Sequence, residues 1–136
     1  MKNDTPTNNK FVTDTMAMIL RLEKRKMSQN AKSLFQSTEA GETFIYIPSM
    51  VFAEILYLSE KNRIKASLDN VENYLKQYPH FQEYPLTFSV LKTSAKINDI
   101  PERHDRLIAA TALSLNLALI TNDPIIEASA FVHTVW

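Results

Sequence analysis

Short apolar runs alternate along this chain with longer stretches in which apolar residues recur at helical spacing. This alternation is typical of βαβ units, in which helices cover both faces of a parallel sheet. The apolar runs predict strands at 10–13, 44–47, 81–86, 118–121 and 131–136. Pro85 lacks an N–H to donate, so it places the third of these strands at a sheet edge or a strand end.

The stretches between the runs predict helices, and several of them begin at a recognisable residue. Thr15, Ser28 and Thr87 are of the types that cap helix N-termini. The other predicted helices are 50–61 after Pro48, 67–77, one that begins near Asp105, and a short one opened by Pro124. We therefore expect an α/β fold with a central parallel sheet.

Length and composition narrow the class of protein further. With 136 residues, the chain predicts one domain over 10–136, preceded by a flexible polar tail at 1–9. There is no apolar run of the ~20 residues that a membrane span needs, and no apolar signal region, so we expect a cytoplasmic location and no membrane partner. The chain has no cysteine, so any metal must be held by oxygen or by one of three widely separated histidines.

The formal net charge is zero, and a neutral chain does not by itself indicate a nucleic-acid partner. Local clusters are nevertheless basic. Residues 21–26 carry four bases against one acid, and Lys61, Arg63 and Lys65 form a second group. Both groups are consistent with a solvated surface or with contacts to phosphates.

Acidic residues follow two of the predicted strands and begin one predicted helix. Asp14 ends the first strand, Asp123 follows the fourth, and Asp105 lies at the start of a helix rich in small residues. In open α/β sheets, functional groups collect at the carboxyl ends of the strands. If the first and fourth strands are neighbours, the three carboxylates meet in one crevice.

Glu54 is the most informative single acid. It lies inside the predicted helix 50–61, where Val51, Ile55 and Leu58 share its face and the opposite face is also apolar. A carboxylate in these surroundings is either buried or lines a cleft, because an unpaired buried carboxylate is costly. We expect it to join the other three acids.

Crowded carboxylates repel one another unless a cation lies between them. Mg²⁺ and Mn²⁺ prefer oxygen ligands, and a bound water can then be activated to attack a phosphodiester. Taken singly, the acids also have structural explanations. Asp14 is of a type that caps helices, Asp123 before proline is common in turns, and the helix dipole favours Asp105. The set of four favours a metal-dependent hydrolase.

The sequence resembles the PIN-domain family, and in particular the small VapC-like toxins of type II toxin–antitoxin pairs. The segments that carry the resemblance are 11–15 (FVTDT), 51–55 (VFAEI), 104–113 (HDRLIAATAL) and 119–123 (LITND). The resemblance implies a three-layer α/β/α sandwich with about five parallel strands in the order 3-2-1-4-5. It further implies Mg²⁺- or Mn²⁺-dependent endonucleolytic cleavage of RNA, a homodimer, and inhibition by a cognate antitoxin.

The resemblance also implies roles for individual residues. Asp14, Glu54, Asp105 and Asp123 match the family's acidic metal-binding positions, and Thr121 matches a position that supports the site. Thr15 and Arg106 are predicted to support it as well, Arg106 either by contacting a phosphate or by pairing with an acid. The segment 102–105 departs from the Asp-Pro of many relatives, which leaves open whether Glu102 or Asp99 serves as an auxiliary acid and whether His104 acts as a base or holds the loop. Asn122 stands where relatives often carry a base.

Two further functions remain open at this point. A PIN-fold protein can act as a binding or assembly module that retains its acids and cuts nothing. A nuclease acting on DNA or on flap structures is a third candidate, although the chain lacks the helical arch and extra domains that such enzymes usually carry.

Overall fold

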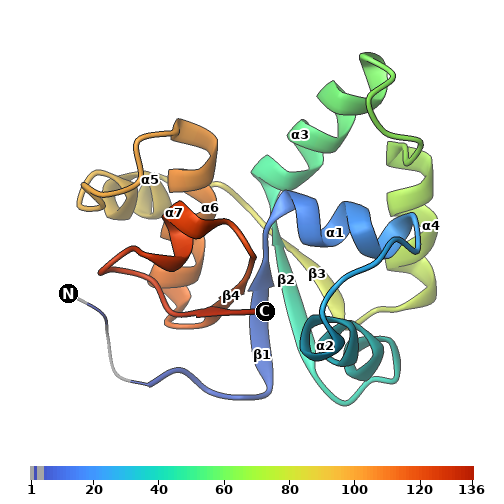
Figure 1. The fold of residues 1–136 in the computed structure, drawn as a ribbon, viewed down its shortest axis with the longest axis horizontal. Coiled ribbons are helices and arrows are strands. Elements are labelled where there is room, and N and C mark those ends of the chain that lie inside the picture. The colour runs from blue at the N-terminus through green and yellow to red at the C-terminus, as the bar shows by residue number, and fades with distance from the viewer. Residues whose placement is uncertain (1, 3–4) are drawn as a thin grey trace.

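A computed structural model of the chain describes residue 2 and residues 5–136. Within these residues, five strands form one parallel sheet in the order β3-β2-β1-β4-β5 (Figure 1). The strands are β1 (Lys10–Thr13), β2 (Phe44–Pro48), β3 (Phe81–Tyr84), β4 (Ala118–Ile120) and β5 (Thr134–Val135). The predicted strand order and the edge position of the third strand are confirmed.

Helices cover both faces of the sheet, so the described residues form the expected three-layer α/β/α sandwich. The helices are α1 (Thr15–Leu22), α2 (Gln29–Glu39), α3 (Ser49–Glu60), α4 (Leu68–Gln77), α5 (Phe88–Ser94), α6 (Arg103–Leu115) and α7 (Pro124–Glu127). In Figure 1, α1 to α4 lie on one side of the sheet and α5 to α7 on the other. The connections leave the sheet in opposite directions on either side of β1.

The register of β1 fixes where the candidate acids meet. β1 pairs in parallel with β2 on one side and with β4 on the other, and Thr13 lies opposite Ile120. The carboxyl ends of β1 and β4 therefore reach the same edge of the sheet. A crevice forms at such a switch point, because the neighbouring helices turn away to opposite faces.

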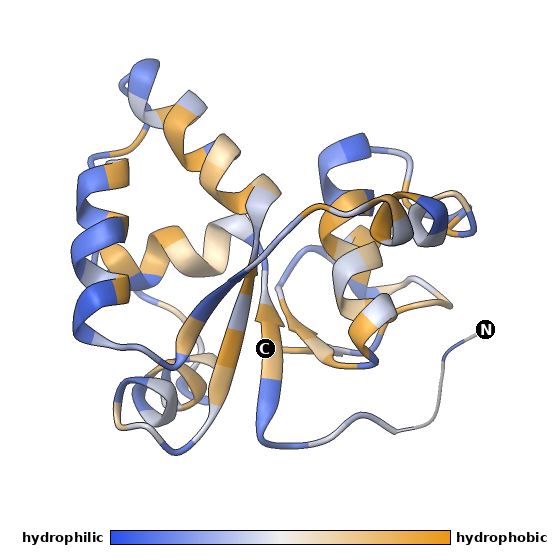
Figure 2. Cartoon of the chain, turned by 180° about the vertical axis from the view of Figure 1, so that it is seen from behind, coloured by the Kyte–Doolittle hydropathy of each residue, from blue (hydrophilic) through white to orange (hydrophobic). Residues whose placement is uncertain are grey.

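The core is built where the sheet is covered on both sides. Val12, Ile45 and Leu119 in the central strands are completely buried. Parallel strands bury both rows of side chains, which is why these segments read as continuous apolar runs. On α6, Ala109 and Ala112 are buried against β1 and β4, and their small side chains permit a close approach. Figure 2 shows the hydrophobic colour over parts of the central strands and the hydrophilic colour over the outer side of α4.

Several element boundaries differ from the sequence-based expectation. Asp14, not Thr15, caps α1: its backbone is extended and its Oδ1 accepts a hydrogen bond from the Ala17 N–H at 2.8 Å. The helix that Thr87 caps, α5, ends at Ser94, because the chain tightens there into turns of i to i+3 hydrogen bonds. The last strand is confined to 134–135, and the third stops before Pro85.

Several helices are followed or capped by a residue in the left-handed backbone conformation. Asn62 follows α3 with φ 56°, and Asn116 caps α6 with φ 52°. Asparagine tolerates this conformation well. Lys24 adopts it after α1, with φ 53°, although lysine rarely does. Helices α1 and α3 end with the same pair of backbone hydrogen bonds. In α1 these bonds run from the Lys24 N–H to the Arg21 carbonyl and from the Arg25 N–H to the Leu20 carbonyl.

The predicted tail at 1–9 falls partly outside the described residues, at positions 1, 3 and 4, and its flexibility stays a prediction. Positions 5–9 form neither helix nor strand. Among the residues that the structure describes, no helix combines the length and the apolar character needed to cross a membrane.

Candidate active site

A pocket of about 410 Å³ lies at the shared edge of β1 and β4. Among the residues that the structure describes, carboxylates from four separate segments line it: Asp14 after β1, Glu54 on α3, Asp105 on α6 and Asp123 after β4. The expectation that these acids share one crevice is therefore met by the geometry.

Thr121 joins the two acids that follow strands. The Asp14 N–H donates to the Ile120 carbonyl at 3.2 Å, which sets the end of β1 beside the end of β4. The Thr121 hydroxyl hydrogen-bonds the Asp14 carboxylate, and its Oγ1 accepts the Asp123 N–H at 3.1 Å. Thr121 is completely buried, so this hydroxyl is a fixed bridge between the two acids.

Glu54 lines the pocket from the middle of α3. Its side chain is 26% exposed, and its Oε1 accepts a hydrogen bond from the Thr15 hydroxyl. Thr15 thus supports the site as a donor to Glu54. The opposite face of α3 is apolar but open at Leu56, which is 41% exposed. Of the two possibilities for Glu54, the structure shows a residue that lines a cleft.

Asp105 lies in the first turn of α6, where Glu102 is the N-cap. Glu102 Oε2 accepts the Asp105 N–H at 2.7 Å, so its carboxylate is engaged in starting the helix. His104 is largely exposed, with Nδ1 3.3 Å from Glu102 Oε1 and 3.8 Å from Glu54 Oε2. This position suits a residue that holds the loop, because its nearest partners are carboxylates.

The acids are crowded enough to disturb their protonation. Burial raises the pKa of Asp14 to about 6; hydrogen bonds from Thr121 and the Ala17 N–H oppose the rise, and the charges of Asp123 and Glu54 add to it. Burial likewise raises the pKa of Asp105 to about 6, with the charge of Glu102 as the next cause. The N-terminal ends of α1 and α6 face the cluster and partly offset this repulsion.

The donor chemistry of the pocket fits a hard divalent ion. Carboxylate and hydroxyl oxygens are the ligands that Mg²⁺ and Mn²⁺ prefer, and a cation would relieve the repulsion that raises the two pKa values. As the described side chains stand, no three of them are placed closely enough to hold one ion. The residues therefore fit such an ion by their chemistry, and its coordination is not defined by their present positions.

Other residues noted in the sequence lie at or beside the pocket. Arg106 donates to the carbonyl oxygens of Ile100 (2.9 Å) and Pro101 (3.1 Å), so its guanidinium holds the loop before α6 and pairs with none of the four acids. Asn122 lines the pocket. Asp99 is occupied elsewhere, since its carboxylate accepts hydrogen bonds from the Ser129 hydroxyl and the Ala130 N–H.

Two apolar residues of the pocket, Met16 and Leu58, were not predicted as site residues. The i+4 spacing did place Leu58 on the face of Glu54, and it lines the pocket from there. Met16 gives no comparable signal, because it is exposed at the start of a helix whose other side is buried.

Comparison with known proteins agrees with this architecture. The sequence model of the PIN domain matches residues 11–132, and the chain belongs to the PIN-domain family. No curated protein sequence matches the chain.

Solved structures with the same fold include toxin–antitoxin complexes. A chain of VapBC2 from Rickettsia felis, bound to a DNA fragment from its promoter, has 17% identity and a TM-score of 0.71, covering 93% of this chain and 97% of that one. A chain of DNA-bound VapBC from Salmonella typhimurium has 18% identity and a TM-score of 0.70, with coverage of 93% and 96%. FitAcB from Neisseria gonorrhoeae has 16% identity and a TM-score of 0.61, with coverage of 93% and 96%. At these identities the likeness shows a shared fold.

Proposed function

We propose that this protein is a Mg²⁺- or Mn²⁺-dependent endoribonuclease and the toxin of a type II toxin–antitoxin pair. The observation that carries the proposal is the convergence of Asp14, Glu54, Asp105 and Asp123 on one pocket at the switch point of the sheet. Membership of the PIN-domain family supports nuclease chemistry at that place.

The four carboxylates would hold the ion, Asp14 and Asp123 most directly and Asp105 and Glu54 directly or through water. A bound divalent ion supplies an activated water and neutralises charge that builds on a phosphate oxygen. Within the protein, Thr121 keeps the two strand-end acids at a fixed separation, and the Thr15 hydroxyl turns Glu54 toward the pocket.

The proposed toxin role is supported by the solved structures that share this fold. The similar VapBC and FitAcB chains come from toxin–antitoxin structures and match this chain over nearly their whole length. We propose a cognate antitoxin as partner, a cytoplasmic site of action and a homodimer. Exposed apolar side chains on α3 and α5, namely Tyr57, Phe88 and Leu91, offer surface for such association.

The test compares cleavage of total cellular RNA by wild type and by Asp14→Asn, with and without a chelator. Asn retains the shape and the cap acceptor but cannot carry the charge. Asp69→Asn on α4 is the matched control, because Asp69 is exposed and lies outside the pocket. We expect chelator and Asp14→Asn to abolish cleavage, while Asp69→Asn cuts like wild type. Equal cleavage by wild type and Asp14→Asn, purified in parallel, would defeat the proposal.

A second candidate is a PIN-fold binding module without nuclease activity. The observation in its favour is that Asp14, Asp123 and Glu102 each cap a helix, which gives these acids a role in folding alone. Purified protein that binds Mn²⁺ and leaves both RNA and DNA intact would decide for the module. Cleavage of DNA in preference to RNA would instead identify a DNA nuclease.

A further inference from the structure

A second hollow of the described surface lies away from the acidic pocket, between the C-terminal end of α1, helix α2 and helix α4. Its volume is about 900 Å³. Five basic side chains line the described part of it, against one carboxylate, Glu39, for a net charge of +4. The bases are Arg21, Lys24, Arg25, Lys26 and Lys32. A third of the chain's 15 Lys and Arg residues therefore gather here, although its formal net charge is zero.

A neutralised pair forms the floor of this basic pocket. Arg21 donates to both oxygens of Glu39, from Nε at 2.9 Å and from Nη2 at 2.6 Å, and the Tyr74 hydroxyl donates to the same carboxylate. Burial opposes the charge on Glu39, but the hydrogen bonds from Arg21 and Tyr74 outweigh it and hold the pKa of Glu39 below its usual value. Glu39 therefore stays ionised and is fully used within the protein.

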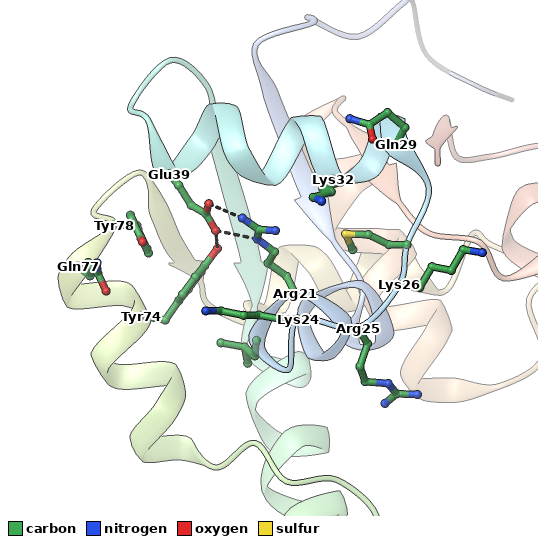
Figure 3. Close-up of a pocket in the computed structure, with 12 residues that line it drawn as sticks. Arg21, Lys24, Arg25, Lys26, Gln29, Lys32, Glu39, Tyr74, Gln77 and Tyr78 are labelled. Atoms are coloured by element: carbon green, nitrogen blue, oxygen red, sulfur yellow. Dashed lines mark hydrogen bonds and ion pairs between the residues drawn. The ribbon is translucent and has the colours of Figure 1, made fainter.

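The rim carries the remaining charge. Lys24, Arg25, Lys26 and Lys32 are exposed; Figure 3 shows Lys24 and Lys32 beside the Arg21–Glu39 pair, and Arg25 and Lys26 farther along the same side, pointing outward. Of these, Arg25 has a carboxylate partner, Glu23 at 3.4 Å, but the hydrogen bonds from the Lys65 and Ala66 N–H groups hold that acid in place. Among the described residues, Lys24, Lys26 and Lys32 form no ion pair, although the charge of Lys24 helps to lower the pKa of Glu39 from a greater distance. Their charges face solvent and are open to an anionic partner.

The backbone conformation of Lys24 is a further indication that its side chain is needed at this place. Lysine occupies the left-handed position after α1, whereas asparagine occupies the matching position after α3. Glycine or asparagine would be less strained at this turn. The turn nevertheless carries a base here, at the rim of the basic pocket, and strained backbone is tolerated where a side chain is needed.

We propose that the basic pocket binds the sugar–phosphate backbone of RNA, at a distance from the acidic pocket. This inference rests on the proposed function for the identity of the anion. The pocket begins at the C-terminal end of α1 and the acids at its N-terminal end, so the length of this eight-residue helix, about 12 Å, separates them. At ~3.4 Å per stacked nucleotide, a strand spans that distance in about four nucleotides.

The lining favours nucleic acid over an acidic peptide. Besides the bases, it contains the side-chain amides of Gln29 and Gln77 and the partly exposed ring of Tyr78. Amides hydrogen-bond sugars and phosphates, and an aromatic face stacks on a base, which is the usual combination in proteins that bind single strands.

The test measures binding of a fluorescent single-stranded RNA by anisotropy at salt concentrations from about 50 to about 200 mM. Affinity that depends on phosphate contacts changes strongly over this range. The Asp14→Asn background is used so that the RNA stays intact. Lys26→Gln with Lys32→Gln removes two rim charges. Lys92→Gln with Lys96→Gln is the matched control, because Lys92 on α5 and Lys96 just after it are both exposed and lie outside the basic pocket.

For a single strand, each lost phosphate contact reduces the magnitude of the slope of log K against log salt by about 0.7. We therefore expect the rim pair, Lys26→Gln with Lys32→Gln, to reduce this magnitude by about 1.4, and the control pair to leave it unchanged. Lys24→Gly should lose about 0.7 while its melting temperature stays equal or rises, because glycine suits the left-handed turn. That variant separates loss of a contact from loss of the fold.

Equal slopes for the rim pair and the control pair would overturn the inference. Displacement of the RNA by polyglutamate as effectively as by unlabelled RNA, from wild type but not from the rim pair, would assign the pocket to an acidic peptide and overturn it too. The slope difference without any RNA cleavage by the wild-type chain would sink the nuclease proposal and support the RNA-binding pocket.

Discussion

Asp14→Asn should stabilise the protein when no metal is present. Asp14 is only 8% exposed, and burial and neighbouring carboxylates raise its pKa to about 6. Its ionised form is therefore less favourable in the folded state than in the unfolded chain. Asparagine removes the charge and keeps an oxygen that can accept the Ala17 N–H, so the cap of α1 survives.

The magnitude follows from the pKa. A carboxyl whose pKa rises from 3.8 to about 6 on folding loses, at 1.36 kcal/mol per unit, about 3 kcal/mol of stability once it is ionised in both states. Because the folded carboxyl holds its proton to higher pH, stability falls as pH rises from about 4 to about 6 and stays low above that. The gain for Asp14→Asn is therefore small at pH 4 and complete at pH 8.

The assay is thermal or urea unfolding followed by circular dichroism, in chelator, at both pH values. At pH 8 we expect Asp14→Asn to be more stable by up to about 3 kcal/mol, or roughly 10 °C in melting temperature for a domain of this size. The exposed Asp69→Asn is again the control, and we expect no such pH-dependent gain from it.

Added Mg²⁺ should reverse the order. A ligand that binds only the folded state at a thousand times its Kd stabilises by about 4.1 kcal/mol, which exceeds the expected difference of about 3 kcal/mol, and the wild-type pocket should gain more of this stabilisation than the variant. A variant less stable than wild type at pH 8 in chelator would refute the reasoning. The protein would then already compensate the Asp14 charge, and the need for a cation would vanish.

Three other substitutions test the surroundings of the two pockets. Thr121→Val should lower cleavage by about tenfold or more and destabilise by about 1 kcal/mol, since it leaves the partly buried Asp123 N–H unpaired, whereas Thr121→Ser should retain most activity in the same RNA assay. Arg21→Met should destabilise by about 3 kcal/mol in urea unfolding because it strands the Glu39 charge, and Arg21→Met with Glu39→Gln should recover part of that loss. His104→Ala should change kcat by less than about tenfold, since His104 is exposed and 3.8 Å from Glu54; a loss of about 10²-fold or more would make it a general base.

Much of the fold was visible in the hydrophobic pattern. The alternation of apolar runs with helical stretches predicted the parallel sheet, and the resemblance predicted its strand order. Asp14 and Asp123 could be placed together because residues after neighbouring parallel strands must reach one edge. Glu54 could be identified because a carboxylate inside an apolar helix is costly to bury without a partner and is therefore expected to line a cleft.

What the sequence did not reveal depends on contacts between distant segments. Nothing near Arg21 in the chain indicates that Glu39 neutralises it or that Tyr74 completes the pair. Lys32, on the next helix, joins the basic group only in three dimensions. The cap of α1 was misassigned to Thr15 because both residues are good caps, and the choice depends on where β1 ends.

The double use of the acids decides how far their presence in a sequence can be interpreted. Asp14 and Asp123 each begin a helix, and a cap of this type contributes about 1 kcal/mol to folding whether or not any RNA is ever cut. A descendant that abandoned catalysis would still be selected to keep a capping side chain at both positions, although asparagine would serve as well as aspartate. Glu54 starts no helix, and its side chain is turned toward the other acids, so its loss would be the earliest trace of an abandoned enzyme.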